Sequence, residues 1–252
     1  MTTRSNKKPS GYILYRGPSL LDGKPIVVVA ITKESKNSKT GNMVQTYIMA
    51  DNGLSPVDSA RILDDVSVCG DCKHRRGMGG SCYVNLGQGA RSVMDGVMRG
   101  IYPEKVLAPR IAAKGRKVRL GTYGDPAAVP AIVWGSLLAD AAGHTGYTHQ
   151  WASGKADHVK QWCMASADTM DEFAAAKFAG WRTFRVRDVN ADGAEGLKYV
   201  NEMACPASEE QGKRLTCEDC MACSGGIDSK KASVTIVVHG SLKNRFAASV
   251  AA

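Results

Sequence analysis

The stretch WCMASADTMDEFAAAKFAGWRTFRV, residues 162–186, carries the most regular pattern in the chain. Residues 162–166 are typical of a short buried strand, and residues 169–179 are typical of a helix with an acidic first turn, where the helix dipole favours negative charge. Gly180 is placed to end that helix, and residues 181–186 form a second apolar strand. A strand, a helix and a strand in this order predict two parallel strands joined by a right-handed crossover.

The same alternation continues on both sides of this stretch. It predicts further strands at 117–123, 146–149, 197–201 and 233–239, and helices at 90–99, 129–141 and 154–160. Repeated strand–helix units predict an α/β fold, either an open parallel sheet or a partial (βα) barrel. This α/β core is expected to carry cysteine-rich metal or cluster loops.

A different pattern precedes the core. Two β-rich runs, at 25–32 and 43–49, flank a turn signal at 37–41 and predict a β-hairpin, and residues 55–63 predict a short helix capped by Ser55. The expected organisation is a flexible tail at 1–10, an N-terminal β-hairpin region at 11–64, the core with two cysteine sites at 65–240, and a C-terminal tail at 241–252.

Composition sets the broad class of the protein. With 252 residues and 44% hydrophobic content, the chain can bury a core without disulfides, which excludes disordered and collagen-like classes. It has no apolar run of about 18 residues, so we expect no membrane span. The first ten residues lack the apolar segment of a secretory signal, so we expect a cytoplasmic protein with reduced thiols.

Four of the eight cysteines predict a metal centre. Cys205 is followed by Cys217, Cys220 and Cys223 in the spacing C-x11-C-x2-C-x2-C. In a reducing compartment, grouped cysteines are typical of metal ligands. Three thiolates within seven residues suit the corners of a [4Fe–4S] cluster better than one small tetrahedral zinc ion. We call this group the four-cysteine site, with zinc as the alternative occupant.

A second group, the three-cysteine site, consists of Cys69, Cys72 and Cys82. One interpretation is a zinc ion that completes its shell with His74, Cys163 or another residue. The other is a second [4Fe–4S] cluster with one iron left open to bind a ligand, as open positions do at catalytic metals. Cys163 is most simply a core residue.

Polar residues follow nearly every predicted strand. In α/β folds, chemistry gathers at the carboxyl ends of the strands, so these residues are candidates for a catalytic pocket. Each also has a structural interpretation, such as Asp125 capping the helix that follows it. The candidates are Asp125, His149, Asp168, Arg185 and His239.

The motifs together resemble a known group of proteins. They are Cys69-Gly-Asp-Cys72, Arg119-Leu-Gly-Thr-Tyr-Gly-Asp125, Gly146-Tyr-Thr-His-Gln-Trp151, Met164-Ala-Ser-Ala-Asp168, the Cys205–Cys223 group and Val237-Val-His239. Over residues 60–240 the chain resembles tailed-phage proteins of unknown function that are remotely similar to radical-SAM proteins. The resemblance implies a cysteine loop before a partial barrel, iron–sulfur clusters, S-adenosylmethionine as a cofactor, and expression in an infected bacterial host. The chain departs from that pattern because residues 69–82 lack the C-x3-C-x2-C spacing.

The net charge of +9 opens a second line of interpretation. Basic stretches at 73–76, 110–119 and 182–187 and in the tail would attract phosphate, so nucleic acid or a nucleotide is a candidate partner. Only 6% of the residues are aromatic, which disfavours a base-stacking platform. Two hypotheses follow. The first is an iron–sulfur α/β protein, with an enzyme of unknown reaction favoured. The alternative is a zinc-stabilised nucleic-acid-binding protein without catalysis.

Overall fold

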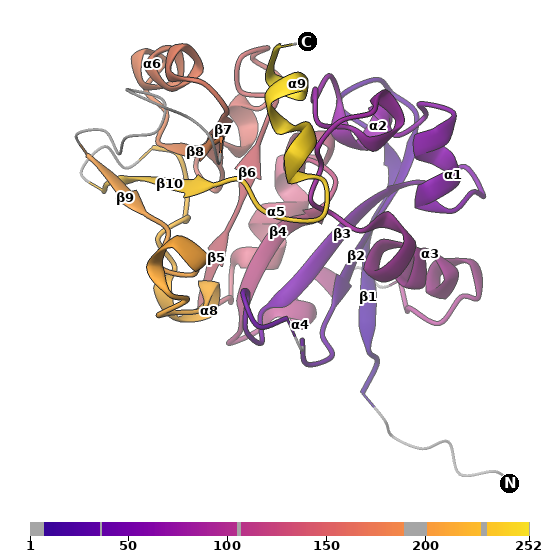
Figure 1. The fold of residues 1–252 in the computed structure, drawn as a ribbon. Helices are drawn as coiled ribbons and strands as arrows, with labels where there is room; N and C mark the ends of the chain where they lie inside the picture. The colour runs from indigo at the N-terminus through magenta and orange to yellow at the C-terminus, as the bar shows by residue number, and fades with distance from the viewer. Residues whose placement is uncertain (1–7, 36, 105–106, 189–200, 228–230, 252) are drawn as a thin grey trace, which may run out of the picture.

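The computed structural model describes residues 8–35, 37–104, 107–188, 201–227 and 231–251, which form a mixed α/β fold with two five-stranded sheets (Figure 1). The first sheet has the order β1-β2-β3-β4-β5, and the second has the order β6-β7-β8-β10-β9. The strands are β1 (Gly11–Pro18), β2 (Pro25–Ile31), β3 (Val44–Ala50), β4 (Lys117–Tyr123), β5 (Gly143–Thr145), β6 (Tyr147–Thr148), β7 (Met164–Ala167), β8 (Thr183–Arg187), β9 (Glu202–Ala204) and β10 (Ser233–Val237).

Short helices connect and cover the strands. The α-helices are α1 (Pro56–Arg61), α2 (Val66–Cys69), α3 (Arg91–Met98), α4 (Ala108–Ala113), α5 (Ala131–Leu138), α6 (Met170–Phe178), α8 (Cys217–Cys220) and α9 (Phe246–Ala251). Single turns are η1 (Arg76–Met78), η2 (Leu86–Ala90), η3 (Pro126–Ala128), η4 (Asp157–Val159), η5 (Glu209–Gln211) and η6 (Lys243–Arg245). Within the described ranges, every helix is too short or too polar to cross a bilayer.

The first sheet begins as an antiparallel meander. β2 pairs with β1 on one side and β3 on the other, which confirms the predicted hairpin. Residues 26–30 of β2 are fully buried, because both faces of this central strand are covered. β3 then pairs with β4 in parallel, and the sheet continues to β5.

The second sheet is parallel throughout, and it contains the predicted strand–helix–strand unit. β7 pairs in parallel with β8, and α6 connects them. The Thr169 side chain caps α6 by accepting the backbone N–H of Glu172. β10, which is late in the sequence, lies between β8 and β9 and pairs with both in parallel.

Some elements differ from their predictions. The helix expected at 154–160 is only the turn η4, because Gly154 adopts a positive φ of 73° at its start. Most of the strand expected at 197–201 lies outside the described residues, and the described strand is β9. The stretch expected as a C-terminal tail contains α9, which lies in front of the junction between the sheets with Phe246 buried (Figure 1).

Candidate functional site

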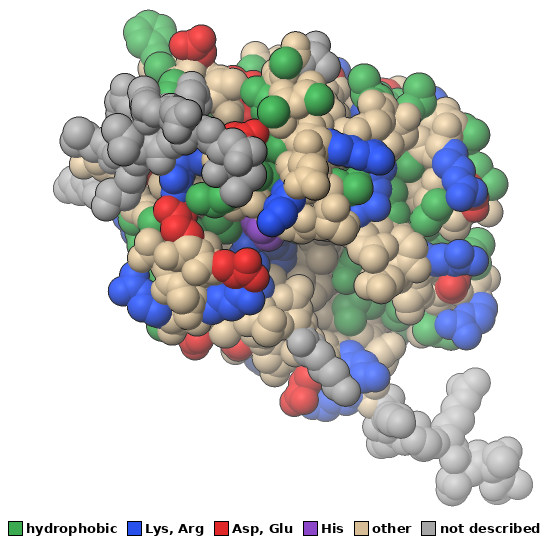
Figure 2. Space-filling view, in the orientation of Figure 1, with side chains coloured by type: hydrophobic (Ala, Val, Ile, Leu, Met, Phe, Trp, Pro, Cys, Tyr) green, Lys and Arg blue, Asp and Glu red, His purple; other side chains and the backbone are tan. Residues whose placement is uncertain are grey.

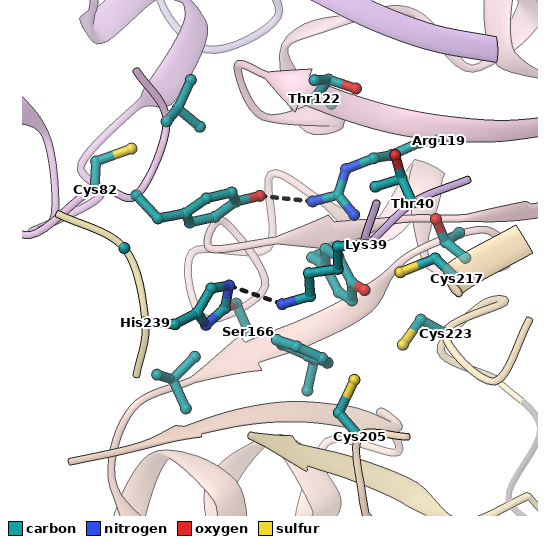
Figure 3. Close-up of a pocket in the computed structure, with 18 of the residues that line it drawn as sticks. Lys39, Thr40, Cys82, Arg119, Thr122, Ser166, Cys205, Cys217, Cys223 and His239 are labelled. Carbon is teal, nitrogen blue, oxygen red and sulfur yellow. Dashed lines mark hydrogen bonds between the residues drawn. The ribbon is translucent and has the colours of Figure 1, made fainter. Parts of the chain in front are cut away.

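Both cysteine groups line one cavity of about 450 Å³. Figure 2 shows this face of the molecule hollowed below α9, with a histidine and basic side chains at the edge of the hollow. Figure 3 shows Cys205, Cys217 and Cys223 on one side of the cavity and Cys82 on the opposite side. The cysteines that line it are Cys69, Cys72, Cys82, Cys205, Cys217, Cys220 and Cys223. All eight cysteines are free thiols, and the eighth, Cys163, is fully buried in the core.

The loop of the three-cysteine site is held by the strand ends beneath it. The backbone N–H of Asp125, just after β4, donates to the carbonyl of Val68 at 2.6 Å. The Gln150 side chain donates to the carbonyl of Cys69 at 3.2 Å. The loop closes on itself where the N–H of Cys82 donates to the carbonyl of His74 at 2.9 Å. The thiols are therefore positioned by the sheet, although the loop has little regular structure of its own.

These three thiols resist ionisation. Burial raises the pKa of Cys72 to about 12 and that of Cys82 to about 11. Burial also raises the pKa of Cys69, and the charges of its two partner cysteines raise it further. A bound cation would reverse this effect, because metal binding replaces the thiol protons. The positive charge of Arg76 acts on Cys82, and two buried guanidinium nitrogens of Arg76 have no hydrogen-bond partner among the described residues.

The four-cysteine site is held on several sides. Thr216 and Asp219 form a capping box at the start of α8, which begins at Cys217. The N–H of Cys217 donates to the carbonyl of Lys39 at 2.8 Å, so the turn between β2 and β3 supports this loop. The N–H of Cys205 donates to the carbonyl of Thr235 in β10, also at 2.8 Å.

The buried Arg182 side chain supports the end of the same loop. Its guanidinium donates to the carbonyls of Ala222 and Gly225 at 2.9 Å and of Ala232 at 2.7 Å. Cys223 lies in the same loop, and burial raises its pKa to about 12. The hydrogen bond between the Tyr147 hydroxyl and this thiol acts in the opposite direction but does not offset burial. The loop of the four-cysteine site is therefore held by hydrogen bonds from several elements of the fold.

Cationic and aromatic side chains lie between the two sites. Lys39 donates to Nε2 of His239 at 2.7 Å, and Arg119 donates to the Tyr83 hydroxyl at 2.6 Å (Figure 3). Burial and the charge of Lys39 lower the pKa of His239 to about 4, so its ring is neutral near pH 7. Burial also lowers the pKa of Lys39, although the charges of nearby cysteines act in the opposite direction.

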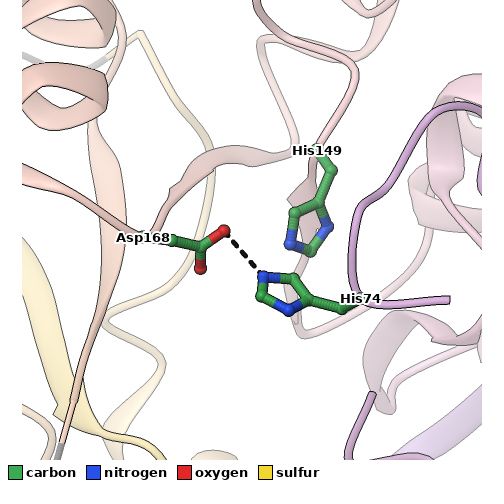
Figure 4. Close-up of side chains that lie close together, drawn as sticks. All are labelled: His74, His149 and Asp168. Atoms are coloured by element: carbon green, nitrogen blue, oxygen red, sulfur yellow. Dashed lines mark hydrogen bonds and ion pairs between the residues drawn. The ribbon is translucent and has the colours of Figure 1, made fainter. Parts of the chain in front are cut away.

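A histidine–carboxylate cluster lies beside the three-cysteine site. Nε2 of His74 is 2.7 Å from Oδ2 of Asp168, and the His149 ring is oriented edge-on to the His74 ring (Figure 4). Burial alone would raise the pKa of Asp168, but the hydrogen bond from His74 and nearby positive charges lower it overall. Asp125 accepts the backbone N–H of His149 at 2.8 Å, and it also caps η3 as predicted from its position.

Four of the five candidates from the strand ends line the cavity, and Arg185 does not. The lining candidates are Asp125, His149, Asp168 and His239. The Arg185 guanidinium is fully buried and forms two hydrogen bonds to the carboxylate of Glu202, at 3.0 and 2.8 Å. Arg182 and Arg187 are also buried, so the basic stretch at 182–187 is not a surface patch.

Several cavity residues were not among the sequence candidates. Four of them, which come from different parts of the chain, are Lys39, Tyr83, Arg119 and Tyr147. The sequence indicates His74 only as a zinc ligand and does not predict its pairing with Asp168. Its position two residues after Cys72, within the cysteine loop, is the signal that could have indicated this role.

Comparison with known proteins returns no matching family model, no matching curated protein and no matching solved structure. The resemblance to tailed-phage and radical-SAM proteins therefore stays a prediction.

Proposed function

We propose that the protein is an iron–sulfur redox enzyme in which two clusters face one substrate cavity. The observation that carries the proposal is the placement of the cysteines. Seven of them come from groups more than 120 residues apart, yet all seven line the same cavity, and only the core residue Cys163 is excluded. Thiols of structural loops alone would have no reason to converge in this way.

We assign a [4Fe–4S] cluster to the four-cysteine site because of the number and type of its donor groups. Cys205, Cys217, Cys220 and Cys223 supply a full set of four ligands. Lys39 and Arg119 contribute positive charge next to these thiols, which favours an anionic cluster. A cluster with four protein ligands relays electrons, and hydrogen bonds to its sulfurs tune the reduction potential.

We assign a cluster with one open iron to the three-cysteine site. It offers three thiols, and the unpartnered guanidinium nitrogens of Arg76 are donors suited to an anionic group at this place. An open iron on the cavity wall would bind substrate directly. The cavity volume of about 450 Å³ is in the range for small-molecule sites, so we propose a small-molecule substrate.

We also propose that the two sheets continue one another as a partial barrel. β5 and β6 are separated only by Gly146, so one stretch of chain pairs first with β4 and then with β7. A side chain at Gly146 would meet the Cys163 sulfur at 2.8 Å, so the close approach requires glycine. Nucleic-acid binding receives less support, because the three arginines at 182–187 are buried.

The proposal is tested by anaerobic purification with iron, sulfide and zinc counts. Two clusters predict brown protein with about eight irons and eight sulfides per chain. The variant with Cys217→Ser and Cys220→Ser should lose about half of the iron, Cys72→Ser should lose the other half, and Cys163→Ala should lose none. Colourless protein with stoichiometric zinc would overturn the proposal and favour zinc-stabilised loops.

A further inference from the structure

We propose that His74, His149 and Asp168 form a third metal site, which binds one divalent first-row transition ion on the cavity wall. The nearest ligand atoms of the three side chains all lie within 4.8 Å of one another. Two ligands of one ion with bonds of about 2.1 Å are about 3.0 Å apart at a right angle and about 4.2 Å apart on opposite sides. Binding would therefore open the 2.7 Å contact between His74 and Asp168 and draw His149 closer, through side-chain rotations. The site uses no thiol and is therefore independent of the proposed clusters.

The surroundings of His74 match those of a metal ligand. To bind an ion through Nε2, this ring must carry its proton on Nδ1, and Nδ1 is 2.7 Å from the Ser81 hydroxyl oxygen. Metal-binding histidines commonly donate their second ring N–H to such an outer partner, which fixes the tautomer and the ring orientation. Phe246 stacks on the other side of His74, with ring centroids 5.5 Å apart, and shields it from solvent.

Asp168 presents an unused ligand atom. The residue is 95% buried, and its Oδ1 has no hydrogen-bond partner among the described residues. A buried carboxylate oxygen without a partner is costly unless something binds it, and an ion would do so. The nearest cation, Lys73, is 3.6 Å from the other oxygen, Oδ2, and forms its closer ion pair with Glu172 at 2.7 Å.

The local charge favours a cation. An imidazole that binds an ion contributes no charge of its own. The buried Asp168 carboxylate lies in the site, and the buried Asp125 carboxylate accepts the backbone N–H of His149. Two histidines and one carboxylate that leave open coordination positions are typical of non-haem Fe(II) sites. All three proposed ligands line the cavity, so the open positions would face the substrate space beside the three-cysteine site.

Mn(II) is a selective probe for this site, because it prefers nitrogen and oxygen ligands over thiolates. The anaerobically purified full-length chain is titrated with Mn(II), and free Mn(II) is counted by electron paramagnetic resonance. We expect one bound Mn(II) per chain, with affinity at least tenfold weaker in Asp168→Asn and His149→Ala. The control variants are His158→Ala and Asp157→Asn. These two residues are adjacent in the sequence and lie outside the cavity, so both variants should bind Mn(II) like the parent chain.

A second readout separates loss of binding from loss of folding. Mn(II) should raise the melting temperature of the parent chain and of Cys72→Ser, but not that of Asp168→Asn. Iron and sulfide counts made on the same samples report on the clusters separately, so either proposal can fail alone. No Mn(II) binding, or binding unchanged by Asp168→Asn and His149→Ala, would overturn the site and leave the His74–Asp168 hydrogen bond as a structural contact.

Discussion

The two cysteine sites share a cavity but are built differently. The four-cysteine site has a complete set of thiols, a capped helix start, and backbone carbonyls held by Arg182. The three-cysteine site has one thiol fewer, and it lies next to His74 and Asp168. In the proposed enzyme, a full ligand set would suit a cluster that only relays electrons. In the proposed enzyme, an incomplete set beside titratable side chains suits the place where substrate would react.

The largest expected difference between the sites is in stability. If the proposed cluster is bound, Cys217→Ala should lower the free energy of unfolding by more than about 4 kcal/mol, because a ligand present at about a thousand times its Kd stabilises the fold by that amount. The loop that would hold the cluster is anchored to β10 through Cys205 and to the β2–β3 turn through Cys217. Cys72→Ala should cost less than about 2 kcal/mol. Anaerobic urea denaturation measures both, with Cys163→Ala as the core control. Equal losses of unfolding free energy in Cys217→Ala and Cys72→Ala would contradict the proposed difference between the two sites.

Arg182 offers the next test of the comparison. Arg182→Ala should cost about 3 kcal/mol, because buried carbonyls lose charged donors, and it should also reduce iron at the four-cysteine site. The matched control is Arg110→Ala, which removes an exposed bidentate pair with Asp140 and should cost less than about 1 kcal/mol. Thermal unfolding and iron counts provide the measurements. If Arg182→Ala kept its full iron content, Arg182 would not be needed to position the thiols of the four-cysteine site.

Asp125 provides the corresponding test next to the three-cysteine site. Asp125→Ala should cost about 1–2 kcal/mol through the lost cap, and it should weaken Mn(II) binding several-fold because His149 loses its backbone anchor. Asp22→Ala is the matched control, since Asp22 also accepts the N–H two residues later but is exposed. Chemical denaturation and the Mn(II) titration distinguish the two variants. An Asp125→Ala protein with parental Mn(II) affinity would contradict the positioning role.

The last effect is confined to acidic pH and concerns the region between the sites. His239 has a folded-state pKa of about 4, below its ordinary 6.5, so the unfolded chain binds more protons between these values. Stability should therefore fall as the pH drops from 6.5 towards 4. His239→Asn should flatten this part of the stability profile, whereas His158→Asn should not. Urea midpoints measured across this pH range provide the test, and a slope unchanged by His239→Asn would refute it.

Local sequence predicts local structure well in this protein. The hairpin, the β7–α6–β8 unit and the Ser55 cap follow from periodicity and capping chemistry, which act over a few residues. Pairing between residues far apart in the sequence cannot be predicted in this way. The burial of Arg185 against Glu202 depends on β10 placing β8 and β9 in one sheet, and no local pattern encodes it.

The same distinction applies to the candidate site. Spacing alone was enough to group the cysteines, and the strand-end rule identified four cavity residues. The convergence of both cysteine groups on one cavity required the tertiary fold. So did the stacking of Phe246 on His74, which joins residues 172 positions apart. Such contacts arise from the packing of whole elements against each other rather than from the propensity of any segment.

The sheet order β8-β10-β9 has a consequence for how the protein matures. β10 follows both cysteine groups in the chain but pairs between two earlier strands, and Cys205 is anchored to Thr235 within it. Because synthesis proceeds from the N-terminus, all the cavity thiols emerge from the ribosome before the strand that fixes the four-cysteine site. Cys205 therefore gains its backbone anchor only after the loop that carries Cys217, Cys220 and Cys223 has been made.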